Sequence, residues 1–136
     1  MPTPTVWVDT DVLVNWLAKE EEPGGRELWR APYALACAAE DGSCRAIASL
    51  TAILEMRFLL RRKKGWTESF VQSVLGRVAQ IFSIEVPDEA DLLRANHLQT
   101  GHPLDPFDAI LLSCALSTEG AVLLTRDKKF LTTHIT

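Results

Sequence analysis

Four acidic residues of this sequence stand in separate segments that a fold could bring together. They are Asp9, Glu55, Asp108 and Asp127. Carboxylates about 4 Å apart repel by roughly 4 kcal/mol per pair at an effective dielectric of about 20, so a cation must neutralise them or some must take up protons. Oxygen ligands without thiolate or imidazole select hard ions such as Mg²⁺ or Mn²⁺. We therefore predict an acidic site that binds a divalent metal ion.

The expected strand ends place three of these acids on one rim. Asp9 follows the β-branched and aromatic run 5–8, and Asp127 follows the apolar run 121–125. Asp108 falls in the first turn of an expected helix that enters from the same rim. Ligands of open parallel sheets collect beyond the carboxyl ends of the strands. The pattern indicates a site that the fold assembles from distant segments.

The fourth acid, Glu55, lies about one turn into a helix expected over 52–64, after a strand expected over 45–48. Its neighbours on that helix are apolar: Ile53, Leu54, Phe58 and Leu59. A glutamate on the apolar side of a helix is costly to bury without a partner. Glu55 therefore either faces solvent or joins the other acids at the rim.

Each acid also has a purely structural explanation. An Asp at a strand end is often a turn former or a helix cap, and Asp108 would favour the positive end of its helix. Asp105, one turn earlier and followed by Pro106, fits an N-cap better than a metal ligand. Surface positions are expected for the histidines, which share no helix face with the acids: His97, His102 and His134. The joint placement of the four acids favours a common site.

The order of the expected elements predicts an α/β fold over a single domain, residues 1–136. Strands are expected at 5–8, 45–48, 81–86 and 121–125, and a last short strand is considered at 134–135. Helices are expected from the spacing of apolar residues at 12–19, 26–40, 52–64, 67–80, 88–98 and 106–119. Strands that alternate with helices indicate a parallel sheet with helices on both faces.

The composition fits a soluble, cytoplasmic protein. Of the 136 residues, 47% are hydrophobic and 24% are charged, which excludes wholesale disorder. The three cysteines follow no metal-binding spacing and indicate free thiols in a reducing compartment. We find no secretory signal and no apolar stretch long enough to span a bilayer, so no membrane partner is expected. The net charge of −4 gives no global positive field for nucleic acid, although a local basic patch would serve.

Four segments, in order along almost the whole chain, together resemble the PIN domain, and most closely the VapC-type toxins of bacterial toxin–antitoxin pairs. The segments are 8–13 (VDTDVL), 49–55 (SLTAILE), 104–109 (LDPFDA) and 124–130 (LTRDKKF). This resemblance implies a PIN-like three-layer α/β/α fold around a central, mostly parallel sheet of about four to five strands.

The same resemblance implies an activity, a cofactor and partners. It implies a Mg²⁺-dependent endoribonuclease, with Mn²⁺ as a second candidate ion, whose metal ligands are Asp9, Glu55, Asp108 and Asp127. It also implies the toxin of a VapBC-type pair, with RNA as substrate, a cognate antitoxin as partner and a homodimer as assembly. Thr125 matches a family residue that supports the fourth acid, and Thr10 matches a small polar position. The longer stretch between the first two acids leaves loop 20–25 without a role.

An acidic site needs basic residues nearby to attract a polyanion. Beside Asp127, the side chains expected to contact phosphate are Arg126, Lys128 and Lys129. A second basic group ends the helix over 52–64, where cations also complement the helix dipole: Arg57, Arg61, Arg62, Lys63 and Lys64. Aromatic side chains on apolar helices belong either to partner interfaces or to the core: Trp16, Trp29, Phe58 and Trp66.

Two other classes of protein share part of the pattern. The spacing of Asp9 and Asp11 resembles the first motif of haloacid-dehalogenase-type phosphatases, which would leave Glu55 idle and which expect a later acidic pair where this chain has a single Asp127. A non-enzymatic, receiver-like Mg²⁺-binding signalling domain would also use an acidic pocket. It expects an aspartate at a strand end where this chain has Ser49.

Overall fold

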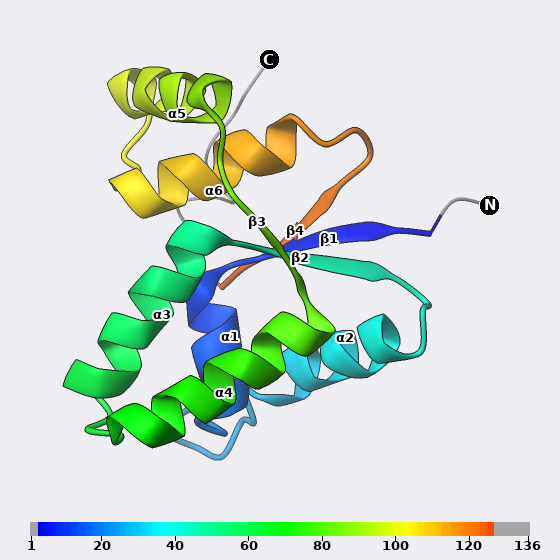
Figure 1. Ribbon diagram of the computed structural model, residues 1–136, viewed down its shortest axis with the longest axis vertical. Coiled ribbons are helices and arrows are strands. Elements are labelled where there is room, and N and C mark those ends of the chain that lie inside the picture. Colours follow the sequence, from blue (N-terminus) through cyan, green and yellow to red (C-terminus); the bar gives the residue numbers. More distant parts are fainter. Residues whose placement is uncertain (1–2, 127–136) are drawn as a thin grey trace.

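The structure is a computed structural model and describes residues 3–126. A parallel sheet lies in its middle (Figure 1). The strands within these residues are β1 (Thr5–Val8), β2 (Arg45–Ser49), β3 (Ser83–Glu85) and β4 (Val122–Leu124), in the spatial order β3-β2-β1-β4. Every pairing is parallel, and Trp7 of β1 lies between Ile47 of β2 and Leu123 of β4. The predicted α/β fold with a parallel sheet is confirmed.

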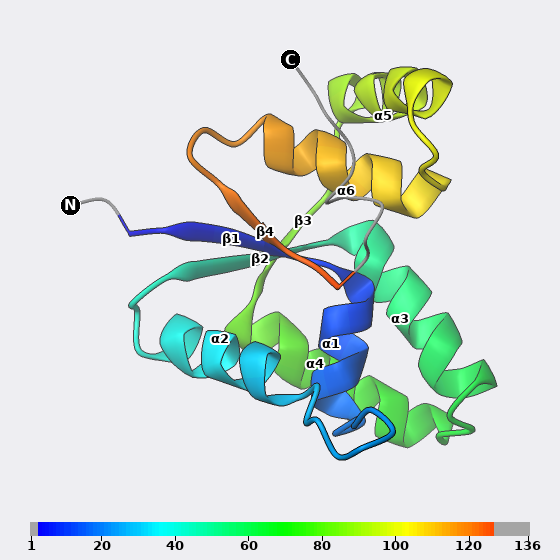
Figure 2. The ribbon, with the colours of Figure 1, turned by 180° about the vertical axis from the view of Figure 1, so that it is seen from behind.

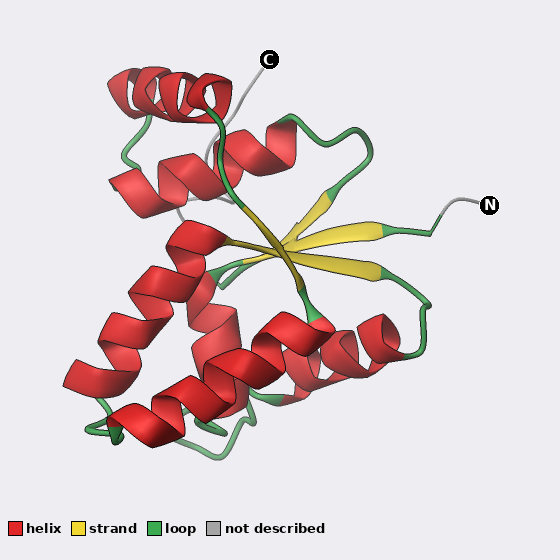
Figure 3. Ribbon diagram, in the orientation of Figure 1, coloured by secondary structure: helices red, strands yellow, loops and turns green. Residues whose placement is uncertain are grey.

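Six helices cover the two faces of this sheet in the described part of the chain. They are α1 (Thr10–Leu17), α2 (Arg30–Glu40), α3 (Leu50–Arg62), α4 (Glu68–Ile81), α5 (Glu89–Gly101) and α6 (Pro106–Leu116). The pair α5 and α6 lies on one side of the sheet, and α1 to α4 lie on the other (Figure 1, Figure 3). The layers are therefore helix, sheet and helix, as the resemblance implied.

Side chains that alternate along the strands build a core on each face of the sheet. Val8 packs in the larger core with side chains of α1, α2, α3 and α4. Its neighbour Trp7 packs on the opposite face with Ile47, Leu111 and Cys114. Successive residues of a strand point to opposite faces, and a parallel sheet covered on both faces is apolar on both. The two cores together determine where β1 ends and where residue 9 stands.

The carboxyl ends of β1 and β4 lie side by side above the start of α1 (Figure 2). The register pairs Val8 with Leu124, the last residue of each strand. The residues that follow both strands, Asp9 and Thr125, are therefore brought together although more than a hundred residues separate them in sequence. This edge of the sheet positions the candidate site.

The helix predicted over 26–40 begins later than expected, at Arg30. An isolated antiparallel bridge joins Glu21 to Glu27, and the two glycines between them have φ values of 107° and 91°. Glycine adopts such positive φ angles without the steric cost that other residues meet. The chain therefore turns back on itself after α1 before the second helix can begin.

The helix predicted over 106–119 ends earlier, at Leu116. The hydroxyls of Ser117 and Thr118 donate to the carbonyl of Cys114 at 2.8 and 3.1 Å. Such local side-chain bonds compete with the backbone bonds that continue a helix. The strand considered at 134–135 lies outside the described residues.

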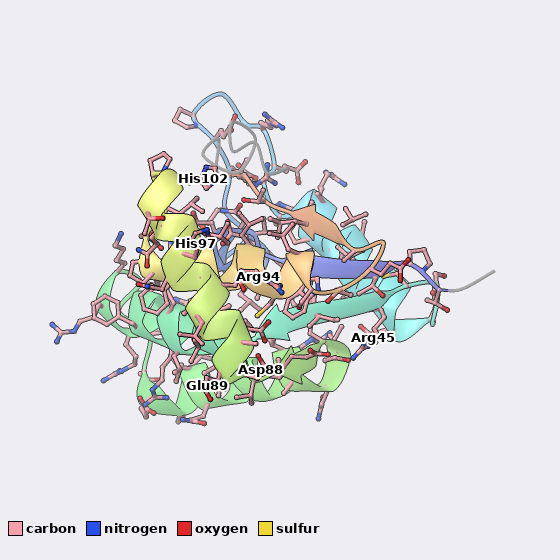
Figure 4. The ribbon with its side chains drawn as sticks, turned by 90° about the horizontal axis from the view of Figure 1, so that it is seen from above. Arg45, Asp88, Glu89, Arg94, His97 and His102 are labelled. Carbon is pink, nitrogen blue, oxygen red and sulfur yellow. The ribbon has the colours of Figure 1, made fainter. Side chains whose placement is uncertain are left out.

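Within residues 3–126, no helix is both long enough and apolar enough to cross a membrane. The cysteines carry free thiols, with Cys37 exposed, Cys44 partly buried and Cys114 buried. On the outer side of the α5–α6 layer, His97 is exposed and His102 is partly exposed (Figure 4). His134 lies beyond the described part of the chain.

Candidate active site at the carboxyl edge of the sheet

Asp9 is buried at the rim of the sheet, with 5% of its surface exposed. Its backbone N–H donates to the carbonyl of Leu124 at 3.0 Å, so the pairing of β1 with β4 continues through it. The Thr125 hydroxyl donates to Oδ2 of Asp9 at 2.7 Å. The resemblance assigned Thr125 to the support of the fourth acid, and the structure shows it supporting the first. This bond fixes the orientation of the Asp9 carboxylate.

Burial is the main cause of the pKa of Asp9 rising from 3.8 to about 6. The hydrogen bonds from the Thr125 hydroxyl and the Thr10 backbone lower this pKa, while the charges of Asp11 and Glu55 raise it. At about 1.4 kcal/mol per pH unit, keeping Asp9 ionised at neutral pH costs about 3 kcal/mol. A cation beside Asp9 would offset that cost.

Glu55, on α3, is half-buried and faces the same rim. Burial is the first cause of its raised pKa, and the charges of Asp105 and Asp11 raise the pKa further. A hydrogen bond from the Thr10 side chain opposes the rise. Glu55 therefore belongs electrostatically to the acidic edge, which the sequence left open between the rim and bulk solvent.

Asp105 is the N-cap of α6, as the sequence predicted. Its Oδ1 accepts a hydrogen bond from the backbone N–H of Asp108 at 2.8 Å, and Pro106 occupies the first turn. Asp105 is exposed and Asp108 is partly buried. Because Asp105 also raises the pKa of Glu55, the start of α6 lies close enough to α3 for their charges to interact.

Asp11 is an acid of this edge to which the sequence assigned no role in a metal site. Its charge raises the pKa values of both Asp9 and Glu55. The sequence feature that could have indicated this role is the position of Asp11 two residues after Asp9, where β1 passes directly into α1. From the sequence, Asp11 fits only the second acid of a phosphatase motif.

The donor chemistry of the edge fits a hard divalent cation, because every candidate ligand is a carboxylate. Among residues 3–126, however, no three His, Cys, Asp or Glu side chains converge closely enough to hold a metal ion. Asp127, Lys128 and Lys129 lie outside the described residues. The common site of Asp9, Glu55, Asp108 and Asp127 therefore stays a prediction.

A polar network holds the chain that leads up to Asp127. The Arg126 Nε donates to Asn15 Oδ1 at 2.7 Å, and its Nη2 donates to the carbonyl of Leu28 at 2.6 Å. Asn15 Nδ2 donates to Glu20 Oε1 at 3.0 Å, and Lys64 Nζ pairs with Glu20 Oε2 at 2.6 Å. Glu20, the first residue of loop 20–25, is part of this network. The sequence alone had suggested no role for that loop. Arg126 thus bonds to protein groups in the structure, and its predicted contact with phosphate stays a prediction.

The basic group at the end of α3 is largely engaged within the protein. Arg57 and Arg61 both pair with Glu68, and Arg61 Nη1 also donates to the Trp66 carbonyl at 2.7 Å. Lys64 belongs to the network just described. These cations hold α3 against its neighbours, so they are not the main candidates for attracting a polyanion.

The aromatic residues divide between core and surface. Trp16 and Trp66 pack against the larger core, and Trp29 is partly buried, with its ring 6.1 Å from that of Tyr33. Phe58 is 57% exposed. Among these four, Phe58 therefore contributes most to the surface.

A parallel sheet with a buried carboxylate of raised pKa at its carboxyl edge places the protein among α/β domains with an acidic site. The PIN domain model matches residues 5–129, and the chain belongs to the PIN-domain family. Members of this family are typically metal-dependent nucleases. The family therefore agrees with the predicted resemblance and favours it over the phosphatase and receiver alternatives.

The fold is similar to that of one chain in the crystal structure of VapBC2 from Rickettsia felis bound to a DNA fragment from their promoter. The TM-score is 0.65 at 19% sequence identity, over 93% of this chain and 91% of that chain. A comparison with curated proteins finds no match.

The raised pKa of Asp9 predicts a stability that falls as the pH rises. The folded pKa of about 6 lies above the ordinary 3.8, so between these values the folded state holds a proton that the unfolded chain has lost. Without metal, the free energy of unfolding should fall by about 3 kcal/mol as the pH rises from about 4 to above 6, apart from other titrating groups. Urea unfolding in EDTA measures this change.

Asp9→Asn is the matched comparison for that titration, because it removes the charge and keeps an oxygen that can accept from Thr125. The variant should be more stable than the wild type above pH 6 and should lose the difference near pH 4. A constant difference between the two proteins across this range would mean that burial does not perturb Asp9.

The polar network predicts a structural role for Asn15. Asn15→Ala removes one hydrogen-bond partner from Arg126 and one from Glu20, and should lower the free energy of unfolding by about 1–3 kcal/mol. Asn96→Ala, at an exposed position of α5, is the control and should change stability little. Equal effects of the two substitutions in urea unfolding would show that the network contributes nothing.

Proposed function

We propose that the protein is a Mg²⁺-dependent endoribonuclease and the toxin of a VapBC-type toxin–antitoxin pair. The observation that carries the proposal is the buried Asp9 carboxylate at the carboxyl edge of a PIN-domain sheet, oriented by Thr125 and close enough to Asp11 and Glu55 for their charges to raise its pKa. A carboxylate that is costly to ionise favours a bound cation. RNA as the substrate rests on the sequence resemblance to VapC-type toxins.

In this proposal the ion is held by Asp9 and Asp108, with Glu55 and Asp127 completing the set. When bound, Mg²⁺ or Mn²⁺ supplies a Lewis acid that lowers the pKa of water and stabilises charge on the phosphodiester. Asp9 presents a carboxylate whose second oxygen is already fixed by the Thr125 hydroxyl. Glu55, whose pKa is raised mainly by burial, orients the attacking water.

The proposed partners are RNA, a cognate antitoxin and a second copy of the chain. The solved structure of similar fold comes from a VapBC2 assembly on promoter DNA, which supports an antitoxin partner for this chain. Lys128 and Lys129 are the proposed phosphate contacts beside Asp127. Arg126 is proposed to act through its bonds to Asn15 and Leu28, which hold the chain before Asp127, as well as by its charge.

The proposal predicts RNA cleavage that depends on both the metal and the acids. Wild-type protein should cleave single-stranded RNA in Mg²⁺ and not in EDTA. Asp9→Asn and Asp108→Asn should each reduce cleavage at least about 100-fold, because each removes a charge that holds the ion. Asp41→Asn, an exposed acid at the end of α2, should leave it unchanged. Gel electrophoresis of labelled RNA measures the products.

Two results would contradict this proposal. Cleavage that survives both EDTA and Asp9→Asn would come from another source or mechanism. Turnover of p-nitrophenyl phosphate without any cleavage of RNA would favour the phosphatase alternative.

Thr125 is predicted to act by positioning Asp9. Thr125→Val keeps the shape and removes the hydroxyl, and should lower activity or metal affinity about 10–100-fold, as expected for residues that orient a metal ligand. Thr125→Ser keeps the hydroxyl and should retain most of the activity. A titration of cleavage against Mg²⁺ measures both variants. If the serine variant were as impaired as the valine variant, packing and not the hydrogen bond would explain the loss.

A further inference from the structure

An open cavity of about 520 Å³ adjoins Glu55 between α3 and α6. We call it the α3–α6 cavity, and its lining residues are Leu54, Glu55, Phe58, Leu59, Lys63 and Phe107. Its volume falls in the range of about 300–1,000 Å³ typical of small-ligand sites. The cavity therefore has room for one planar group beside the acidic edge.

The walls of this cavity are exposed carbon surface. Leu54 and Phe58 are each 57% exposed, and Phe107 is 43% exposed. The two rings come from α3 and α6, the helices that also carry Glu55 and Asp108. Phe107 immediately precedes Asp108 in the chain. Two exposed aromatic rings thus line the same cavity as the Glu55 carboxylate.

Lys63 gives the cavity its positive charge. It lines the α3–α6 cavity together with Glu55, and it also lines a smaller neighbouring cavity of about 190 Å³ together with Asp11 and Glu20. Within residues 3–126 it makes no ion pair, in contrast to Arg57, Arg61 and Lys64. The Arg62 guanidinium lies 5.8 Å from the centre of the Phe58 ring. Two cations therefore border the apolar wall.

We propose that the α3–α6 cavity binds one unpaired nucleobase of an RNA strand, with Phe58 and Phe107 against the base and Lys63 on the adjoining phosphate. This proposal rests on the proposed ribonuclease function and names the form of its substrate. A single strand alternates planar bases with phosphates, and the cavity offers ring surface and positive charge side by side. Bases stack on aromatic side chains in a sequence-tolerant way, because every base has a π-face.

The same chemistry disfavours other occupants. A paired base lies inside its helix and cannot present a face to Phe58. An apolar peptide would match the rings but would leave Lys63 without an anionic partner next to Glu55. The substrate is therefore a single-stranded stretch of RNA, with one base held beside the acids.

Binding of two oligomers with the same charge tests this subsite. The probes are a fluorescein-labelled short oligoadenylate and an abasic ribose-phosphate oligomer of equal length, measured by anisotropy in EDTA. The wild type should bind oligoadenylate roughly tenfold more tightly than the abasic oligomer, as expected for the stacking of one base. Phe58→Leu should remove most of this difference and leave binding of the abasic oligomer unchanged. Phe107→Leu should act in the same direction.

Matched controls separate the ring and the charge from general effects. Phe70→Leu changes a ring on α4 that is 51% exposed and should leave the preference for bases intact. Lys63→Ala should weaken the binding of both oligomers equally and reduce the salt dependence by about one ion. Arg45 is the first residue of β2, at the end of the strand away from α3, and it pairs with Glu85 (Figure 4). Arg45→Ala removes this cation and should change the binding of either oligomer little.

The subsite and the ribonuclease can fail separately. If the wild type cleaves RNA in Mg²⁺ but Phe58→Leu and Phe107→Leu keep the full preference for bases, the subsite is overturned and the nuclease stands. The subsite is also overturned if Phe58→Leu dissociates a dimer in analytical ultracentrifugation without changing RNA binding, since the ring then serves an interface between copies. If the wild type shows no Mg²⁺-dependent cleavage, the proposed function itself fails.

Discussion

The structure depends on the burial of one carboxylate at the edge of a parallel sheet. Asp9 stands where β1 ends, because the packing of Trp7 and Val8 into opposite cores fixes the strand up to that point. Its backbone pairs with Leu124 and its carboxylate accepts from Thr125, so the central strand β1 and the edge strand β4 together fix its position. Burial makes its charge costly, and the neighbouring acids increase that cost. A fold that maintains such an arrangement gains stability whenever a cation binds there.

The protein holds this edge with charges that were candidates for substrate binding. Arg126 is bonded to Asn15 and to the Leu28 carbonyl, and Lys64 is paired with Glu20. These contacts join β4, α1, the loop after α1 and the end of α3 around the base of the site. Most of the basic residues of α3 are therefore structural. Lys63, which lines both cavities beside the acids, makes no ion pair within residues 3–126 and is a cation that could meet a ligand.

The family and the site contribute different parts of the functional argument. The PIN-domain match and the fold define a scaffold that is typically a metal-dependent nuclease. The local features of this chain suggest what the scaffold would act on. Exposed rings and a lysine that makes no ion pair within residues 3–126 lie beside Glu55. This combination suits the ligand we propose, because an unpaired RNA strand carries both negative charge and planar groups. The resemblance to VapC-type toxins and this surface chemistry therefore point to the same class of substrate.

The sequence by itself determined the elements and the caps, because apolar periodicity and residues such as Asp105 and Pro106 act over one or two helical turns. It placed Asp9 at the carboxyl edge of the sheet, and the family resemblance added Glu55, whose own segment left it open between that edge and solvent. Only the tertiary structure decided that Thr125 orients Asp9 and that the charge of Asp11 raises the pKa of Asp9. It also decided that Arg126 bonds to Asn15 and that Lys64 pairs with Glu20. The tertiary structure also set the start of α2 at Arg30, four residues later than the apolar pattern predicted. These contacts join residues far apart in the chain, and their partners are chosen by strand register and helix packing, which no local pattern encodes.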